Sequence, residues 1–359
     1  MVNLERFRRL GLDTAEAVAI LDDLAILAEY KYDHYELYSH GKKFLDSLFG
    51  WLRQFEAEDR LDALLFVRHK LVFVSQRELQ DLNRFLFFDK IVPAILRIII
   101  QREDLGPFEM GVAYNNFFEK YLRRCLFVGL SDGSKIDYFR RQHQILNQEQ
   151  VIPYYKTDAS EYVTRLREDL RDEQASFEII FLIDDFTASG YTMINRHRDP
   201  STGKDSFDGA LMRFARRHEQ ILDSASQVFL CHYVATEAAH RHVTDLANRI
   251  PEYRGKFQTL SALPLSPSLS IRNNSSDIIN QSFSRICEAY YSDAFESINT
   301  KKGRGIKWGF GEQALPVVLY SNAPNNSLYP IWLERSGNEA PPSFSALFPR
   351  VDRHKAQKA

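Results

Sequence analysis

The sequence predicts an α/β fold, a mainly parallel β-sheet flanked by helices, with a helical region before it and a further segment after it. Two observations support this fold class. From about residue 121, short apolar runs alternate with stretches of helical periodicity, which is typical of strands joined by crossover helices. Before residue 120, apolar residues recur at intervals of three and four, the spacing of helices that bury one face.

The first predicted part, residues 1–120, is a helical region. Asp13 with Glu16, and Ser75 with Glu78, form capping-box patterns that mark two helix starts. Apolar stripes at helical spacing follow both of them.

The second predicted part, residues 121–335, is the α/β domain. Its predicted strands are 125–130, 151–155, 177–183, 227–234 and 256–260. Its predicted helices are 136–145, 160–170, 207–222 and 237–250. Closer to the carboxyl terminus, the sequence predicts a helix at 278–294 and a strand pair at 314–320 and 329–333, and residues 336–359 are predicted to be a flexible tail.

Composition narrows the possible functions without identifying one. The chain has 359 residues, 44% of them hydrophobic, which is enough for sizeable cores. Lys plus Arg at 46 against Asp plus Glu at 48 gives no broad basic field for nucleic acid. The longest apolar run, 91–100, is about half as long as a membrane-spanning helix, and the amino terminus lacks a secretory-signal layout. We therefore expect a cytoplasmic protein without membrane contact. Three widely spaced cysteines are expected to be buried thiols.

The segment that carries chemistry is 177–192, Phe-Glu-Ile-Ile-Phe-Leu-Ile-Asp-Asp-Phe-Thr-Ala-Ser-Gly-Tyr-Thr. An apolar strand leads into Asp184 and Asp185, and ligands of open α/β sheets bind beyond the carboxyl ends of strands. Carboxylates accept hydrogen bonds from vicinal ribose hydroxyls. Gly190 allows a close approach of the backbone, so the following amides and hydroxyls could hold a phosphate. These residues are Thr187, Ala188, Ser189, Gly190, Tyr191 and Thr192.

Two other interpretations of this segment explain less. An apolar strand ending in two acids also binds Mg²⁺ in P-loop ATPases, but no Gly-x-x-x-x-Gly-Lys-Ser/Thr loop precedes it. A helix-start turn capped by Asp185 or Thr187 would account for neither the double acid nor the Ser-Gly-x-Thr that follows.

The segment resembles the signature of type I phosphoribosyltransferases, in which four apolar residues precede Asp-Asp-x-x-Ala/Thr-Thr/Ser-Gly-x-Thr. The resemblance implies the fold of that superfamily and Mg²⁺-dependent transfer from 5-phosphoribosyl diphosphate. It also implies that Asp184 and Asp185 act in catalysis on the ribose hydroxyls and Mg²⁺, and that residues 187–192 bind the 5-phosphate. One departure is the polar insertion 195–208, because relatives usually continue from this loop into a helix.

Two further segments fall where such an enzyme would bind diphosphate. Ser131, Asp132, Gly133 and Ser134 follow a predicted strand, and relatives bind pyrophosphate at this place through main-chain amides. An ordinary capped turn is the alternative. Lys156 follows the second predicted strand, where a basic residue of relatives reaches the diphosphate. The alternative for Lys156 is a solvated surface lysine.

The carboxyl-terminal segment from Trp308 to Trp332 resembles the phosphoribosyltransferase branch linked to prokaryotic conflict and defence, called PRTase-CE. In the wider superfamily a hood grips the acceptor, which makes Phe310, Asn325 and Asn326 candidates by location. The resemblance implies an enzyme that uses Mg²⁺ and an unidentified acceptor such as a nucleobase, and it leaves room for a homodimer or defence-system partner proteins. A non-catalytic sensor of phosphoribosyl diphosphate or of a nucleotide, and an enzyme of nucleotide hydrolysis, are the alternatives.

Overall fold

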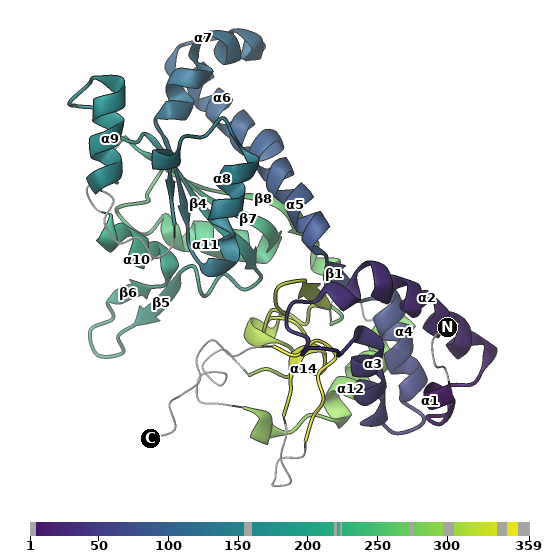
Figure 1. Ribbon diagram of the computed structural model, residues 1–359. Helices are drawn as coiled ribbons and strands as arrows, with labels where there is room; N and C mark the ends of the chain where they lie inside the picture. Colours follow the sequence, from purple (N-terminus) through teal and green to yellow (C-terminus); the bar gives the residue numbers. More distant parts are fainter. Residues whose placement is uncertain are drawn as a thin grey trace. The chain divides into compact units, whose positions relative to one another are not determined.

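The computed structural model describes residues 5–153, 160–218, 221–222, 225–272, 276–296, 305–335 and 343–350. The chain divides into two compact units, one formed by Gln80–Leu265 and the other by Met1–Leu79 together with Ser266–Ala359 (Figure 1). This division differs from the predicted boundaries at residues 120 and 335, because helical segments between residues 80 and 123 pack with the sheet.

A five-stranded parallel sheet forms the centre of the unit 80–265. Its strands are β2 (Cys125–Gly129), β3 (Val151–Ile152), β4 (Ile179–Thr187), β7 (Gln227–Thr236) and β8 (Phe257–Leu265). They are arranged in the order β3-β2-β4-β7-β8, and all neighbours are parallel, which confirms the predicted fold class. The chain leaves β2 for β3 on one side and returns to β4 on the other. Ligands of such sheets bind at this reversal, beyond the carboxyl ends of the strands.

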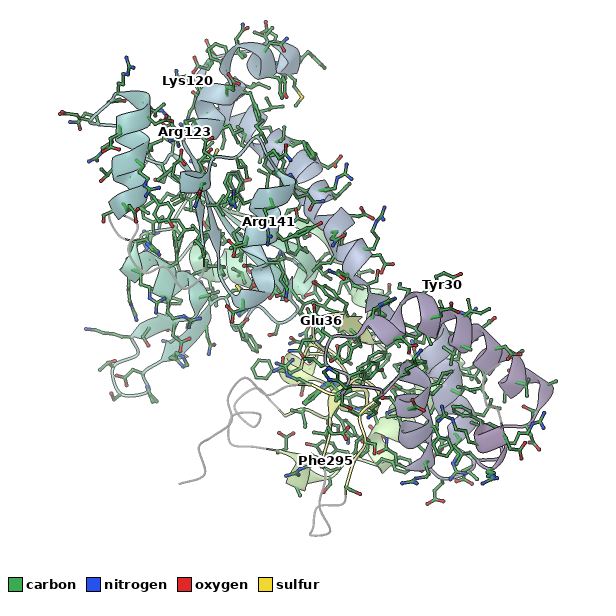
Figure 2. The ribbon with its side chains drawn as sticks, viewed as in Figure 1. Tyr30, Glu36, Lys120, Arg123, Arg141 and Phe295 are labelled. Atoms are coloured by element: carbon green, nitrogen blue, oxygen red, sulfur yellow. The ribbon has the colours of Figure 1, made fainter. Side chains whose placement is uncertain are left out.

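Helices cover both faces of this sheet (Figure 1). The helical segments in this part of the chain are α5 (Gln76–Phe85), the π-helix η2 (Leu86–Ile91), α6 (Val92–Arg102), α7 (Met110–Arg123), η3 (Asp132–Ser134), α8 (Ile136–Gln142), η4 (Gln148–Gln150), α9 (Ser160–Leu170), α10 (Ala210–Arg217) and α11 (Glu237–Ala247). The π-turn η2 comes just before Pro93, which lacks the N–H that a regular helix would use. Arg123, labelled in Figure 2, ends α7 and lies 3.1 Å from Glu149.

The two faces of the sheet are packed differently. On one face Phe127, Phe181 and Phe229 stack across β2, β4 and β7, with ring centroids 5.1 Å apart in each step. Phe139 of α8 and Phe87 of η2 pack against the first of these rings. On the other face, aliphatic residues of the strands form one cluster with residues of α9, α10 and α11. Burial of this apolar surface fixes which side chains of β4 point to each layer.

β4 is longer than predicted. It includes Asp184 and Asp185 because β7 pairs with it as far as Thr187, whereas β2 pairs with it only to Ile183. Both acids therefore lie beyond the end of β2. β3 is described only as Val151–Ile152, since the rest of its predicted range lies outside the described residues.

The polar insertion forms an antiparallel hairpin of β5 (Asn195–Arg198) and β6 (Asp205–Asp208) (Figure 1). The hairpin separates the candidate phosphate loop from α10, which begins at Ala210 instead of the predicted residue 207 because β6 extends to Asp208.

The second unit is mainly helical. Its elements are α1 (Glu5–Arg8), α2 (Ala15–Tyr30), η1 (Tyr32–His34), α3 (Phe44–Arg53), α4 (Arg60–His69), β1 (Val72–Val74), η5 (Pro267–Leu269), α12 (Ile278–Ala289), η6 (Asp293–Phe295), η7 (Phe310–Glu312), β9 (Val317–Leu319) and α14 (Tyr329–Trp332). Thr14, not Asp13, caps α2 by accepting a hydrogen bond from the Ala17 amide at 3.2 Å. Among the described residues of either unit, no helix combines the length and apolarity needed to cross a membrane.

Two predictions for the carboxyl-terminal part differ from the structure. The strand predicted at 329–333 is the short helix α14, because Pro330 favours a first helical turn and cannot donate to a sheet, and β9 pairs with β1 instead. Residues 343–350, predicted to belong to a flexible tail, pack into this unit. The ring of Phe348 packs against the rings of Tyr35 and Phe73, with centroids 5.2 and 5.4 Å apart.

Candidate functional site

The two acids of β4 lie at the point where the strand order reverses. Asp184 is buried, with 5% of its surface exposed, and Asp185 is half-buried. Ser131, in the turn after β2, donates a hydrogen bond from Oγ to Asp184 Oδ1. The Asp185 amide donates to the same oxygen at 3.1 Å, and the Phe186 amide donates to Asp185 Oδ1 at 2.9 Å.

Burial raises the pKa of Asp184 well above its usual range, and the charge of Asp185 raises it further. Hydrogen bonds from Ser131 and from the Asp185 amide oppose this shift only in part. Two neighbouring carboxylates in a dry site do not both ionise readily. A bound divalent cation would remove this penalty by stabilising the doubly ionised pair.

The candidate diphosphate loop, residues 131–134, is close to these acids. Gly133 approaches Asp185 so closely that a Cβ at this glycine would lie 2.6 Å from Asp185 Cγ. The Gly133 amide donates to Ser131 Oγ at 3.1 Å, and the Ser134 amide donates to the Ser131 carbonyl at 3.2 Å. The capping expected of an ordinary turn is thus present. The same turn nevertheless brings two of its residues against the two acids.

The candidate phosphate loop, residues 188–192, rests on α11. Gly190 has a φ of +75°, and a Cβ there would lie 2.8 Å from Val243 Cγ2 and 3.1 Å from the Ala239 carbonyl. Thr236 caps α11 and also donates to the Ala188 carbonyl at 2.6 Å. Glycine is required at position 190 for two reasons, its left-handed backbone and its contact with the helix.

The loop has donors to offer a ligand. Within the part of the chain that the structure describes, the amides of Ser189, Gly190 and Thr192 donate to no other residue. The buried Thr187 Oγ has no hydrogen-bond partner there either. Successive free amides in a turn form a concave anion-binding surface. The loop is therefore suited to bind a phosphate.

Four further predicted residues remain, namely Lys156, Phe310, Asn325 and Asn326. Lys156 lies outside the described residues. Phe310, Asn325 and Asn326 belong to the second unit and bond to one another: the Phe310 amide donates to the Asn325 carbonyl and Asn326 Nδ2 donates to the Phe310 carbonyl, both at 2.7 Å. These bonds fix a turn in that unit.

The hydrogen bond between Thr236 and Ala188 could not be predicted from the sequence. The position of Thr236 before a predicted helix identifies it as a cap, but no sequence pattern links it to Ala188, 48 residues away. The same is true of Tyr233, which bonds to the Ser134 carbonyl from 99 residues away.

The carboxylates of Asp184 and Asp185 suit Mg²⁺ better than a metal ion that takes all of its ligands from the protein. Among the described residues, no three His, Cys, Asp or Glu side chains are grouped to hold a metal ion. Mg²⁺ commonly uses one or two carboxylates, keeps several waters and shares the phosphates of a substrate. Asp184 and Asp185 beside the candidate phosphate loop would suit that arrangement.

The reversal in strand order, the acidic pair and the glycine-containing loop define an α/β protein of the type I phosphoribosyltransferase kind. A comparison with protein-family models finds PRTase-CE, whose model matches residues 48–350, and the chain belongs to that family. Neither curated proteins nor solved structures gave a match. The family match confirms the resemblance on which the sequence analysis relied.

Proposed function

We propose that the protein is a Mg²⁺-dependent phosphoribosyltransferase that uses 5-phosphoribosyl diphosphate as donor. The observation that carries the proposal is the hydrogen bond from Ser131 to Asp184, which joins the candidate diphosphate loop to the candidate ribose-binding acids at the reversal of strand order. Membership of PRTase-CE supports the same class of reaction. The acceptor is a nucleobase or another nitrogen nucleophile.

Each segment has a role in this proposal. Asp184 and Asp185 accept hydrogen bonds from the ribose hydroxyls, and the amides of Ser189, Gly190 and Thr192 hold the 5-phosphate. The loop 131–134 and Lys156 bind the diphosphate. In the reaction, the bond from ribose C1 to the diphosphate oxygen breaks and a bond from C1 to the acceptor nitrogen forms. Positive charge develops on the ribose in between, where neighbouring carboxylates stabilise it.

When bound, Mg²⁺ would neutralise part of the charge on the departing pyrophosphate. Asp184 and Asp185 are the residues that would hold it. Asp132, within the candidate diphosphate loop, has an exposed carboxylate that would repel the negative charge of a diphosphate. A bound cation would offset this repulsion. A role in prokaryotic defence, in the cytoplasm and with partner proteins of such a system, rests on the family alone.

A non-catalytic sensor of the same ligand is the second candidate. One observation favours it: the candidate diphosphate loop, residues 131–134, contains no basic residue to neutralise a departing pyrophosphate. A sensor needs only the binding groups. It would retain the affinity for phosphoribosyl diphosphate without releasing pyrophosphate.

Calorimetry followed by product analysis tests both candidates. Phosphoribosyl diphosphate should bind in the presence of Mg²⁺ and bind more weakly with EDTA, and ribose 5-phosphate alone should also bind. Pyrophosphate release with one member of a panel of nucleobases and amines supports the enzyme. Binding without release under all conditions supports the sensor, and absence of binding contradicts both.

A further inference from the structure

A chain of buried polar residues lies behind the diphosphate loop. The Tyr233 hydroxyl, on β7, donates to the Ser134 carbonyl at 2.9 Å, and Asn83 Nδ2, on α5, donates to the Tyr233 hydroxyl at 3.0 Å. His143, at the end of α8, lies with Nε2 2.8 Å from Asn83 Oδ1. None of Asn83, Tyr233 and His143 exposes more than 2% of its surface.

The donor and acceptor of each bond in this chain follow from one another. The Asn83 amide nitrogen faces Tyr233, so its oxygen faces His143 and accepts a hydrogen bond from Nε2. Burial lowers the pKa of His143 to about 4, so its ring is neutral and Nε2 carries the single hydrogen. The ring is also stacked on Phe87, with centroids 4.2 Å apart.

The diphosphate loop, to which these buried polar residues bond, ends in a strained backbone conformation. Lys135, directly after Ser134, has a φ of +48° in the left-handed region. For a residue with a Cβ this conformation is unfavourable, and it persists only where surrounding contacts enforce it. The Ser134 carbonyl belongs to the peptide unit that connects these two residues. A hydrogen bond to that carbonyl therefore holds the peptide unit in its unfavourable orientation.

On the other side of the loop, further hydrogen bonds connect it to the two acids. Ser134 Oγ donates to the Ser131 carbonyl at 2.6 Å, and Ser131 Oγ donates to Asp184. The loop is thus held from both sides, by Asp184 in front and by Tyr233 behind. Buried hydrogen bonds of this kind restrict the conformation of the segments that they connect.

We propose that Tyr233, supported by Asn83 and His143, is a positioning residue that holds the loop 131–134 in the conformation that binds diphosphate. This inference rests on the proposed function for the identity of the ligand. Tyr233 is buried and bonds to the loop 131–134, so its effect should appear at the diphosphate and not at the 5-phosphate, for which residues 188–192 are proposed.

Tyr233→Phe tests the inference, with Tyr253→Phe as a matched control. Tyr253 is also fully buried and donates its hydroxyl to a backbone carbonyl, that of Leu211, at 2.7 Å. Both variants lose one buried hydroxyl and its hydrogen bond to a backbone carbonyl, and Tyr233→Phe also removes the acceptor of the Asn83 amide. Tyr233→Phe should weaken Mg²⁺-pyrophosphate binding about tenfold, equivalent to about 1.4 kcal/mol, and change ribose 5-phosphate affinity less than twofold. Tyr253→Phe should change neither affinity. Equal pyrophosphate affinity in the two variants would overturn the inference.

A second measurement does not require a ligand. Amide hydrogen exchange at Gly133 and Ser134 should be faster in Tyr233→Phe than in wild type and in Tyr253→Phe, because the loop opens more often when its anchor is lost. Unchanged exchange would overturn the positioning role even if the protein binds pyrophosphate. If wild type binds neither ribose 5-phosphate nor pyrophosphate, the proposed function fails, while the exchange rates still decide whether Tyr233 positions the loop.

His143 gives a further test through rescue by a conservative variant. In His143→Gln the side-chain amide can place a donor near the position of Nε2, whereas His143→Leu keeps the volume without a donor. Pyrophosphate affinity should therefore be near wild type in His143→Gln and several-fold weaker in His143→Leu. Equal loss in both variants would mean that His143 acts only through packing, and it would remove His143 from the network.

Discussion

Ser131 Oγ donates a hydrogen bond to Asp184 Oδ1, although the two residues are 53 positions apart in the sequence. The bond couples the turn after β2 to the neighbouring strand β4. Because Asp184 is buried beside Asp185, its hydrogen bonds and its charge depend on what occupies the site. A ligand that ionises Asp184 would also strengthen the bond from Ser131, since hydrogen bonds to charged acceptors are stronger.

The double substitution Asp184→Asn with Asp185→Asn should abolish binding of phosphoribosyl diphosphate. Each charge-assisted hydrogen bond contributes about 1.5–3 kcal/mol, so losing two of them should lower the affinity by at least ~100-fold. The protein should remain folded, because the amides keep the shape of the side chains and remove a charge that is costly to bury. Calorimetry measures the affinity, and thermal unfolding checks the fold.

Asp208→Asn, on the exposed hairpin, is the control for this substitution, since it also removes one carboxylate. It should leave the affinity unchanged. A folded double variant at positions 184 and 185 that binds with wild-type affinity would contradict the proposed site.

Gly190→Ala should weaken ribose 5-phosphate and phosphoribosyl diphosphate alike and spare pyrophosphate. Gly255→Ala is its control, because the two glycines have φ angles of +75° and +76°. Both variants should lose about 1 kcal/mol of stability from the left-handed backbone. At Gly190 alone the new methyl group also meets Val243, whereas nothing lies within 4 Å of it at Gly255. Binding by calorimetry should therefore fall only for Gly190→Ala, and equal affinities in the two variants would place the 5-phosphate elsewhere.

The sequence predicted the parts of the site that are continuous in the chain. The apolar run before Asp184 predicts a buried strand, and the small residues after Asp185 predict a loop that can approach a phosphate. The extension of β4 through both acids could not be predicted, because it depends on pairing with β7 as far as Ala235. The contact of Gly133 with Asp185 depends in the same way on which strands are neighbours.

Tyr233 shows why the supporting residues remained hidden. In the sequence it is one aromatic residue in an apolar strand, and most such residues only fill a core. Its role depends on Ser134 and Asn83, which are 99 and 150 residues away. The helix α14 was mistaken for a strand for a local reason, because the apolar residues 329–333 fit either type and only Pro330 favours the helix.

The stability of the protein should depend on His143 at acidic pH. Its pKa in the folded protein is lowered to about 4, mainly by burial and further by the positive charge of Arg84, whereas in the unfolded chain it is about 6.5. Above about pH 6.5, His143 is neutral in both the folded and the unfolded state, and it does not lower the free energy of unfolding. As the pH falls from 6.5 to 4, the unfolded state takes up the proton first, so the free energy of unfolding falls by about 2–3 kcal/mol.

Urea unfolding at several pH values measures this effect. Burial also lowers the pKa of His232 and of His240, so the informative quantity is the difference between wild type and His143→Gln, which cannot be protonated. The variant should lose less stability than wild type between pH 6.5 and pH 4. Parallel curves would show that His143 takes up its proton at the same pH in the folded protein as in the unfolded chain.

Lys156 separates the enzyme from the sensor. If its ammonium meets the diphosphate as it departs, Lys156→Ala should lower the rate of pyrophosphate release more than it weakens the binding of the donor, because the charge matters most in the transition state. A charge contact of a few kcal/mol corresponds to a loss of roughly ten- to several-hundredfold in rate. A sensor has no rate to lose. Lys204→Ala, at the tip of the exposed hairpin, removes the same charge elsewhere and should leave the rate unchanged. Steady-state release with an active acceptor, together with calorimetry of the donor, gives both quantities. A rate undiminished in Lys156→Ala would return this lysine to the solvated surface and assign the leaving group to residues 131–134 alone.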